Sequence, residues 1–222
     1  MRLLIALILI VLPITGAAQE PDPWHVGYEH FDPRVQVGAA SPSQMLGHHP
    51  AAVEDQVTVA AQDIVDHTGL RLNFAPAPAH VPNAMAYMGA NGVRLLLYNP
   101  QFMTKVHDRI NPDWGIISIL SHEIGHHLQG HIFQNDAGFH QRELEADEFT
   151  GFVLYRMGAT LREAQSATSA LAQDFDVSTH PRRATRLTAI ERGWNRAQAV
   201  ALHEALLSQR RHAQGENSPP KP

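Results

Sequence analysis

Apolar residues recur at helical spacing along most of the chain after residue 50. Between Val53 and His67 they fall every three or four positions, with Gly69 just beyond as a stop signal, so we predict an amphipathic helix there. The stretch from Asn111 to Gly130 opens with a capping residue and a proline, and it is apolar around much of its circumference, as in a buried central helix. Further helices are predicted over residues 141–157, 160–175, 182–193 and 195–211.

Three shorter stretches have the pattern of β-strands. Leu70–Phe74 alternates apolar and polar residues, Ala84–Met88 is a short apolar run, and Val93–Tyr98 is rich in strand-forming residues. The glycines of Gly89–Gly92 lie between the last two and predict a hairpin turn. Together with the helices, these strands predict an α+β fold that is mainly helical and carries a small antiparallel sheet.

The two ends of the chain lack this pattern. Arg2 precedes an apolar run over residues 3–12, and small residues follow up to Ala18, which predicts a signal peptide over residues 1–18. The run is far shorter than the ~20 residues of a membrane span, so we expect no stable membrane insertion after cleavage. Residues 19–52 predict an extended arm and residues 213–222 a disordered tail, which leaves one domain over residues 53–212. We therefore expect an exported protein, periplasmic or secreted.

Composition narrows the classes of function. The 222 residues include 17 Lys+Arg and 22 Asp+Glu, and a net charge of -5 gives no basic excess for binding nucleic acid. Because the chain has no cysteine, disulfides, thiolate metal sites and cysteine nucleophiles are excluded. The 15 histidines are the unusual feature, since imidazole is the commonest ligand for transition metals.

His122, Glu123 and His126 form the pattern H-E-x-x-H inside the predicted central helix. Two imidazoles four positions apart share one helix face and can bind one Zn²⁺, while Glu123 can act as the general base on a water molecule. An extended version of this motif supplies a third histidine, but Gln129 and Ile132 occupy the positions that it requires. His131, just past the helix, is expected to have a structural or surface role.

The third ligand is expected on the next helix. Glu143, Asp147 and Gly151 are spaced by four residues, so they form one stripe in which the glycine allows another helix to approach closely. Glu143 would complete the metal site, and Asp147 would accept the outer N–H of a ligand imidazole. Glu145 stays open as a rival ligand, or else as a solvated or salt-bridged side chain. An acidic first helical turn is also an ordinary way to complement the helix dipole.

H-E-x-x-H followed by E-x-x-x-D resembles the gluzincin pattern, and residues 142–147 with Gly151 are similar to the second-helix signature of M48 family zinc metallopeptidases. The segment Ser178–Pro181 resembles a His-Pro segment of that family, and Pro82–Ala84 resembles the start of its substrate-side strand. The likeness spans roughly residues 53–194. Only 16 residues lie between the second histidine and the third ligand, fewer than is usual in the family.

This resemblance implies a zincin-like metallopeptidase domain and one Zn²⁺ per chain, bound by His122, His126 and Glu143. It implies that His180 lies near the zinc, where it either donates to the developing oxyanion or occupies the open position. Arg186 would line the cleft or contact a substrate carbonyl, with an ordinary helix salt bridge as the alternative. Asn83 and Ala84 would contact substrate from the strand.

We therefore expect a zinc-dependent endopeptidase that hydrolyses peptide bonds in unfolded or extended protein segments, as in quality control of the cell envelope. One alternative is a zinc-containing, chaperone-like binding protein with little or no turnover. Another is a metal-sequestering protein that uses its many histidines and binds more than one metal per chain. The sequence assigns neither a particular substrate nor an oligomeric state.

Overall fold

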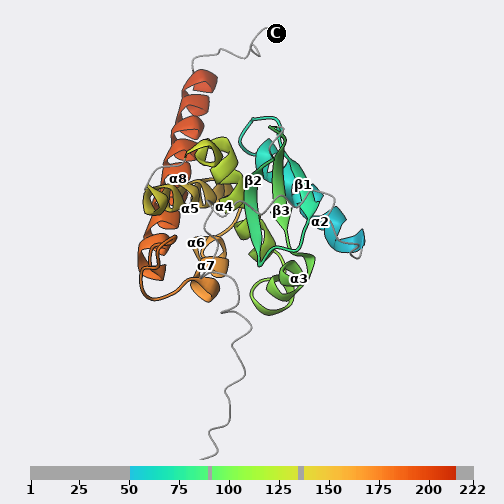
Figure 1. Ribbon diagram of the computed structural model, residues 1–222. Helices are drawn as coiled ribbons and strands as arrows, with labels where there is room; N and C mark the ends of the chain where they lie inside the picture. The colour runs from blue at the N-terminus through green and yellow to red at the C-terminus, as the bar shows by residue number, and fades with distance from the viewer. Residues whose placement is uncertain (1–50, 90–91, 135–137, 214–222) are drawn as a thin grey trace, which may run out of the picture.

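The computed structural model describes residues 51–89, 92–134 and 138–213. The predicted signal peptide, the predicted arm up to residue 50 and the predicted tail after residue 213 lie outside the described residues. The described chain is mainly helical and contains a three-stranded sheet (Figure 1), which confirms the α+β prediction. The assignment to a zincin-like class stays a prediction.

The sheet is mixed rather than antiparallel. Strands β1 (Ala75–Pro78), β2 (Ala84–Met88) and β3 (Arg94–Tyr98) stand in the order β1-β3-β2. β2 and β3 form the predicted antiparallel hairpin, whereas β1 pairs in parallel with β3. The expectation of a wholly antiparallel sheet was therefore wrong, because a hairpin turn fixes only the pairing of the two strands that it joins.

The first strand also begins later than predicted. Residues 70–73 are irregular, and β1 starts at Ala75, in a segment that contains Pro76 and Pro78. Prolines cannot donate to a sheet ladder, so they argue against a central strand but are tolerated at an edge. The strand order makes β1 an edge strand, which explains why this segment pairs despite its prolines.

Helix α2 (Ala51–Asp66) confirms the first predicted helix. Its buried side chains lie on one face, which packs against α4 and β1. Helix α3 (Pro100–Arg109) was not predicted, although Asn99 caps it by accepting the backbone N–H groups of Gln101 and Phe102. A cap followed by proline was the signal that could have revealed it. From Gln56 onward, the buried face of α2 consists of Val57, Ala61, Ile64 and Val65.

Helix α4 (Gly115–Leu128) is the predicted central helix. The side chain of Asn111 accepts the N–H groups of Asp113 and Trp114, so it acts as the expected cap one turn before the regular helix. The apolar face of α4 enters the main core, where Leu120 and Ile124 are fully buried. A short 3-10 turn, η1 (His131–Phe133), follows α4.

The second half of the chain contains α5 (Phe139–Arg156), α6 (Leu161–Ala164), α7 (Ser166–Leu171) and α8 (Arg183–Ala213). The predicted capping box at Thr160 is present, but the helix expected over residues 160–175 is divided into α6 and α7. The two helices expected after Pro181 are one 31-residue helix, so Asn195 continues a helix instead of capping one.

Three glycines let α5 approach its neighbours at backbone distance. A Cβ atom added at Gly151 would lie 1.8 Å from the carbonyl oxygen of Ile190 on α8, and one added at Gly193 would lie 1.8 Å from the carbonyl oxygen of Glu148 on α5. At Gly125 on α4 the nearest atom, the Cα of Ala146, would be 3.1 Å away. The close approach predicted at Gly151 is therefore present, and α8 is the helix that makes it.

The outer end of α8 extends past the rest of the molecule (Figure 1). Leu202 is 63% exposed there, and the last residue of α8 with a buried side chain is Ala197. Within the described part of the chain, no helix combines the length and apolarity that a membrane crossing requires.

Candidate metal centre

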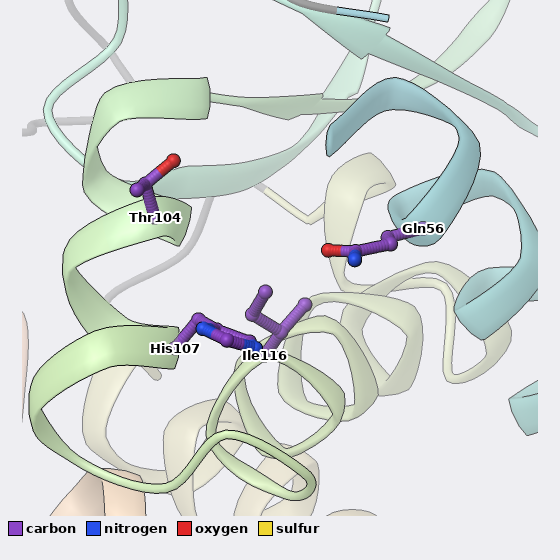
Figure 2. A pocket seen from close by; sticks show the side chains of 4 residues that line it. All are labelled: Gln56, Thr104, His107 and Ile116. Atoms are coloured by element: carbon purple, nitrogen blue, oxygen red, sulfur yellow. The ribbon is translucent and has the colours of Figure 1, made fainter. Parts of the chain in front are cut away.

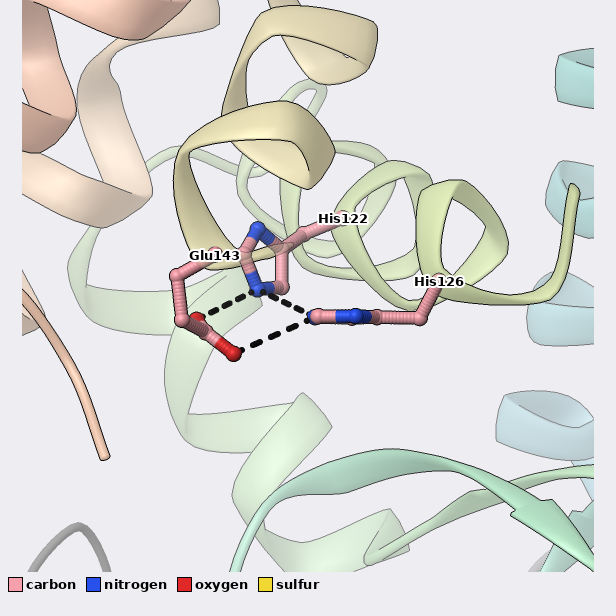
Figure 3. A group of neighbouring side chains, drawn as sticks. All are labelled: His122, His126 and Glu143. Atoms are coloured by element: carbon pink, nitrogen blue, oxygen red, sulfur yellow. Dashed lines mark hydrogen bonds and ion pairs between the residues drawn. The ribbon is translucent and has the colours of Figure 1, made fainter. Parts of the chain in front are cut away.

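Two adjacent helices bring three metal-binding side chains together. α4 supplies His122 and His126, which share one face because they are four residues apart, and α5 supplies Glu143 (Figure 3). One ligand atom from each of the three lies within 4.8 Å of the others, so the group could hold a metal ion. The structure thus brings together the three residues that the sequence predicts as ligands.

The two Nε2 atoms and the two carboxylate oxygens of these side chains lie close together. The Nε2 atom of His122 lies 3.1 Å from Oε2 of Glu143, and the Nε2 atom of His126 lies 3.3 Å from Oε1 of the same carboxylate. The two Nε2 atoms are 3.2 Å apart. All three side chains are only 12–14% exposed, so the group is nearly closed off from solvent but still accessible.

Behind His122 lies a buried ion pair. The Nδ1 atom of His122 is 2.9 Å from Oδ1 of Asp147, as predicted for the acceptor of its outer N–H. Arg186 on α8 donates to both oxygens of Asp147 at 2.8 Å, in a bidentate pair. The structure therefore places Arg186 in a salt bridge between two helices, buried under Asp147, and its expected contact with substrate stays a prediction.

Behind His126 lies a second imidazole. Nδ1 of His126 is 3.0 Å from Nδ1 of His131, and Nε2 of His131 is 3.0 Å from Oε2 of Glu145. Sequence reasoning missed this contact and left Glu145 as a rival ligand. Gly130, with φ at +74°, turns the chain after α4 and returns His131 to the helix face, which no residue spacing within a helix could reveal.

Glu123 lies next to the three candidate ligands but is not one of them. Its Oε2 atom accepts the backbone N–H of Ala86 in β2 at 2.9 Å, so the edge strand holds this carboxylate. Burial raises the pKa of Glu123, and the carboxylate of Glu143 adds to the rise, while the two nearby imidazoles oppose it. A raised pKa suits a group that must take up a proton.

The residues expected to contact substrate, Asn83 and Ala84, lie at the start of the same strand. Asn83 directly precedes β2, and its carbonyl oxygen accepts the N–H of Asn99 at 2.7 Å. Ala84 is the first residue of β2 and is buried. Both are within three positions of Ala86, so they lie on the part of the sheet edge that reaches Glu123.

The charges of the group are strongly coupled in the metal-free chain. Burial opposes the charged form of His122, but the carboxylates of Asp147 and Glu143 outweigh it and raise its pKa to about 10. Burial likewise opposes the charged form of Glu143, but the surrounding imidazoles, His180 foremost, hold its pKa well below the usual value. The carboxylates of Asp147 and Glu143 therefore favour a positive charge beside them.

His180 also reaches this group, from the segment before α8. Its Nε2 atom lies 3.3 Å from Oε2 of Glu143, and its Nδ1 atom lies 2.7 Å from the hydroxyl oxygen of Thr179. Burial lowers the pKa of His180 to about 4, so the ring is neutral near pH 7. If the hydroxyl of Thr179 donates to Nδ1, the ring proton is on Nε2 and faces the ligand group.

Another cavity, of about 150 Å³, lies where α2, α3 and α4 meet (Figure 2). It is lined by Gln56, Thr104, His107 and Ile116. None of the predicted site residues lines this cavity, and its three polar lining side chains come from two helices, Gln56 from α2 and Thr104 and His107 from α3. It has no convergent set of chemical groups comparable to the metal centre.

The likeness to M48 metallopeptidases stays a prediction that depends on the motif residues and on the arrangement described above. The convergence of His122, His126 and Glu143 is a property of this chain itself. Comparison of the chain with protein-family models, with curated proteins and with solved structures finds no match.

Proposed function

We propose that this protein is an exported zinc-dependent endopeptidase that hydrolyses peptide bonds in unfolded or extended protein segments. The observation that carries the proposal is the convergence of two imidazoles and one carboxylate, with a second, partly buried carboxylate, Glu123, beside them. Two histidines and a glutamate are a ligand set of catalytic zinc sites, which keep a fourth position open.

The spacing of the ligand atoms supports zinc. Nitrogen or oxygen atoms that bind one tetrahedral zinc ion at about 2.0–2.1 Å stand about 3.3 Å from one another. The Nε2 atoms of His122 and His126 are 3.2 Å apart, and they lie 3.1 and 3.3 Å from the two different oxygens of the Glu143 carboxylate. The Nδ1 atom of His122 faces Asp147, which fixes a proton on that nitrogen and leaves the Nε2 lone pair available for a metal.

A bound zinc ion supplies Lewis acidity, which polarises a substrate carbonyl and lowers the pKa of water. Glu123 takes the proton from the attacking water and passes it to the nitrogen of the leaving amine. Its raised pKa favours the protonated state that the second of these steps needs. The N–H of Ala86 keeps the carboxylate oriented through one of its oxygens, so the other is available for the proton.

His180 stabilises the negative charge that develops on the carbonyl oxygen of the substrate. As a neutral ring with its proton on Nε2, it can donate one hydrogen bond, and such a donor is worth about 3 kcal/mol in the transition state. The hydroxyl of Thr179, 2.7 Å from Nδ1, favours this tautomer.

An extended peptide fits the strand beside the site. β2 lies at the edge of the sheet, and Ala86 turns its N–H away from β3 and toward Glu123. Because the N–H of Ala86 is bound to Glu123, the other outward-facing backbone groups of β2 are the ones that would pair with a substrate strand. Folded proteins rarely offer such a strand, which favours unfolded or loop segments as substrates.

The decisive experiment compares zinc content and casein cleavage for the wild type and Glu123→Gln. The substitution keeps the shape and the acceptor oxygen for Ala86 but removes the base. We expect full zinc content and a 10²–10⁴-fold loss of cleavage, the usual range for a general base. Undiminished cleavage would remove Glu123 as the base. Zinc binding without any cleavage by the wild type would favour the chaperone-like alternative instead.

The third ligand is tested by a matched pair on α5. Glu143→Ala should release zinc, whereas Glu148→Ala, which removes a carboxylate that pairs with Arg192 and Arg196, should leave the zinc content unchanged. Glu145→Ala should also retain zinc when zinc is saturating, because Glu145 is not a ligand in this proposal. Retention of zinc by Glu143→Ala together with its loss from Glu145→Ala would show that Glu145, and not Glu143, is the third ligand.

A further inference from the structure

The outer face of His126 is closed by two groups that the proposed reaction does not use. His131 meets the Nδ1 atom of His126 at 3.0 Å, with the two rings nearly edge-on at 69°. The side chain of His131 is 4% exposed, although it follows the end of α4 by three residues. Its other nitrogen, Nε2, lies 3.0 Å from Oε2 of Glu145 on α5.

Only one arrangement of the protons on His126 and His131 is compatible with a metal bound to Nε2 of His126. A neutral imidazole that offers Nε2 to a metal carries its proton on Nδ1, so that nitrogen must donate. The Nδ1 atom of His131 must then accept, which places the proton of His131 on Nε2. From there it can be donated to the carboxylate of Glu145. Glu145 thus fixes the tautomer of His131, and His131 fixes the tautomer of His126.

Glu145 is itself held in place on the far side. Gln141, one turn earlier on α5, donates from Nε2 to Oε1 of Glu145 at 2.8 Å. Oε2 is therefore left for His131, although the side chain of Glu145 is 41% exposed. The left-handed conformation of Gly130 and the short turn η1 place His131 between the two helices.

We propose that His131, oriented by Glu145, is a positioning residue for the metal ligand His126. It accepts the Nδ1 proton of His126, which keeps the Nε2 lone pair directed at Glu143 and His122. This inference rests on the proposed metal site, and it assigns to an imidazole the role that a carboxylate or a carbonyl group usually has behind a ligand histidine.

The test uses two substitutions of the full chain that differ in one property. His131→Leu removes the acceptor, whereas His131→Asn keeps an oxygen at the position of Nδ1 and so retains the hydrogen bond from His126. We expect zinc affinity, measured by competition with a chromophoric chelator, to fall about 10–100-fold in His131→Leu and to stay within about threefold of the wild type in His131→Asn. Equal loss in both variants would overturn the proposal, since it would indicate packing alone.

A spectroscopic readout separates positioning from stability. In the zinc-loaded wild type, the Nδ1 proton of His126 should give a downfield NMR signal that persists in His131→Asn and is lost in His131→Leu. The visible spectrum of the Co²⁺-loaded protein should change only in His131→Leu. His203→Leu, on the exposed outer end of α8, is the matched control and should alter neither spectrum.

If His131→Leu does not fold, Glu145→Ala compared with Glu148→Ala decides the question. Glu145→Ala should weaken zinc binding by about 3–10-fold, and Glu148→Ala should have no effect. Equal affinities would overturn the proposed role of Glu145 and, with it, the proposed chain of hydrogen bonds from His126 through His131 to Glu145. A wild type that binds no zinc would instead refute the proposed metal site, so the two failures are distinguishable.

Discussion

The two histidines of the H-E-x-x-H motif lie on one helix, yet they are supported in opposite ways. Behind His122 is a fully buried carboxylate, Asp147, whose charge is balanced by Arg186 from α8, a helix that lies further along the chain. Behind His126 is a neutral ring, His131, which comes from the turn directly after the same helix. The first support depends on how α5 and α8 pack, and the second depends mainly on a local turn.

This difference predicts how substitutions on each side of the site should affect folding and metal binding. The pair on the His122 side exists only if α8 lies against α5 at backbone distance, which Gly151 and Gly193 permit. The His126 side needs only the turn at Gly130 and one partly exposed carboxylate. Substitutions on the first side should therefore affect folding and metal binding together, whereas those on the second should affect metal binding alone.

The largest expected effect is at the contact between α5 and α8. Gly193→Ala would place a methyl group 1.8 Å from the carbonyl oxygen of Glu148, so α8 must move away or the chain must unfold. We expect the free energy of unfolding to fall by about 5 kcal/mol or more, measured by urea titration. Gly125→Ala, with its nearest atom at 3.1 Å, should cost only about 1–3 kcal/mol. Equal costs would contradict the close approach.

Next in size is the buried ion pair. Asp147→Asn removes the carboxylate that pairs bidentately with the buried guanidinium of Arg186 and leaves only Glu143, at 3.9 Å, as a counter-charge; breaking a buried pair typically costs about 3–5 kcal/mol. The same substitution should weaken zinc binding by about 10–100-fold, because His122 keeps an acceptor oxygen but loses the carboxylate charge that strengthens its Nδ1–H hydrogen bond. Differential scanning calorimetry and chelator competition measure the two effects. A variant with unchanged affinity would show that His122 needs no carboxylate behind it.

A smaller effect is expected from pH in the metal-free protein. The pKa of His122 is about 10 in the folded chain, against about 6.5 when unfolded, so the folded state binds the extra proton between these values. The resulting stability is fully present below about pH 6.5 and is lost as the pH rises through about 10. We expect urea titrations to show a fall of about 1–3 kcal/mol across this window. Saturating zinc or Asp147→Asn should flatten the profile, and a flat profile for the metal-free wild type would contradict the coupling.

The smallest effect is expected on the His126 side. Glu145→Gln keeps an oxygen that can accept from His131 and removes only the charge from a side chain that is 41% exposed. We expect about a two- to threefold loss of zinc affinity and a change of less than about 0.5 kcal/mol in the free energy of unfolding. A loss as large as that of Asp147→Asn would remove the contrast between the two sides.

The sequence alone predicted the parts of this molecule that lie within single elements. The helix spacing of His122 and His126, the stripe of Glu143 and Asp147, and the hairpin of β2 and β3 are all confirmed. These features depend on the periodicity of one helix or on one turn, which the covalent chain sets locally. The capping box at Thr160 was predictable for the same reason.

Only the tertiary structure decided the features that join elements far apart in the chain. The parallel pairing of β1, the continuity of α8 through Asn195, and the placement of Arg186 under Asp147 depend on which surfaces pack together. The contact of His131 with His126 depends on a left-handed glycine that turns the chain back. Spacing along a helix fixes directions within that helix, but the distances between elements follow from the packing of the whole core.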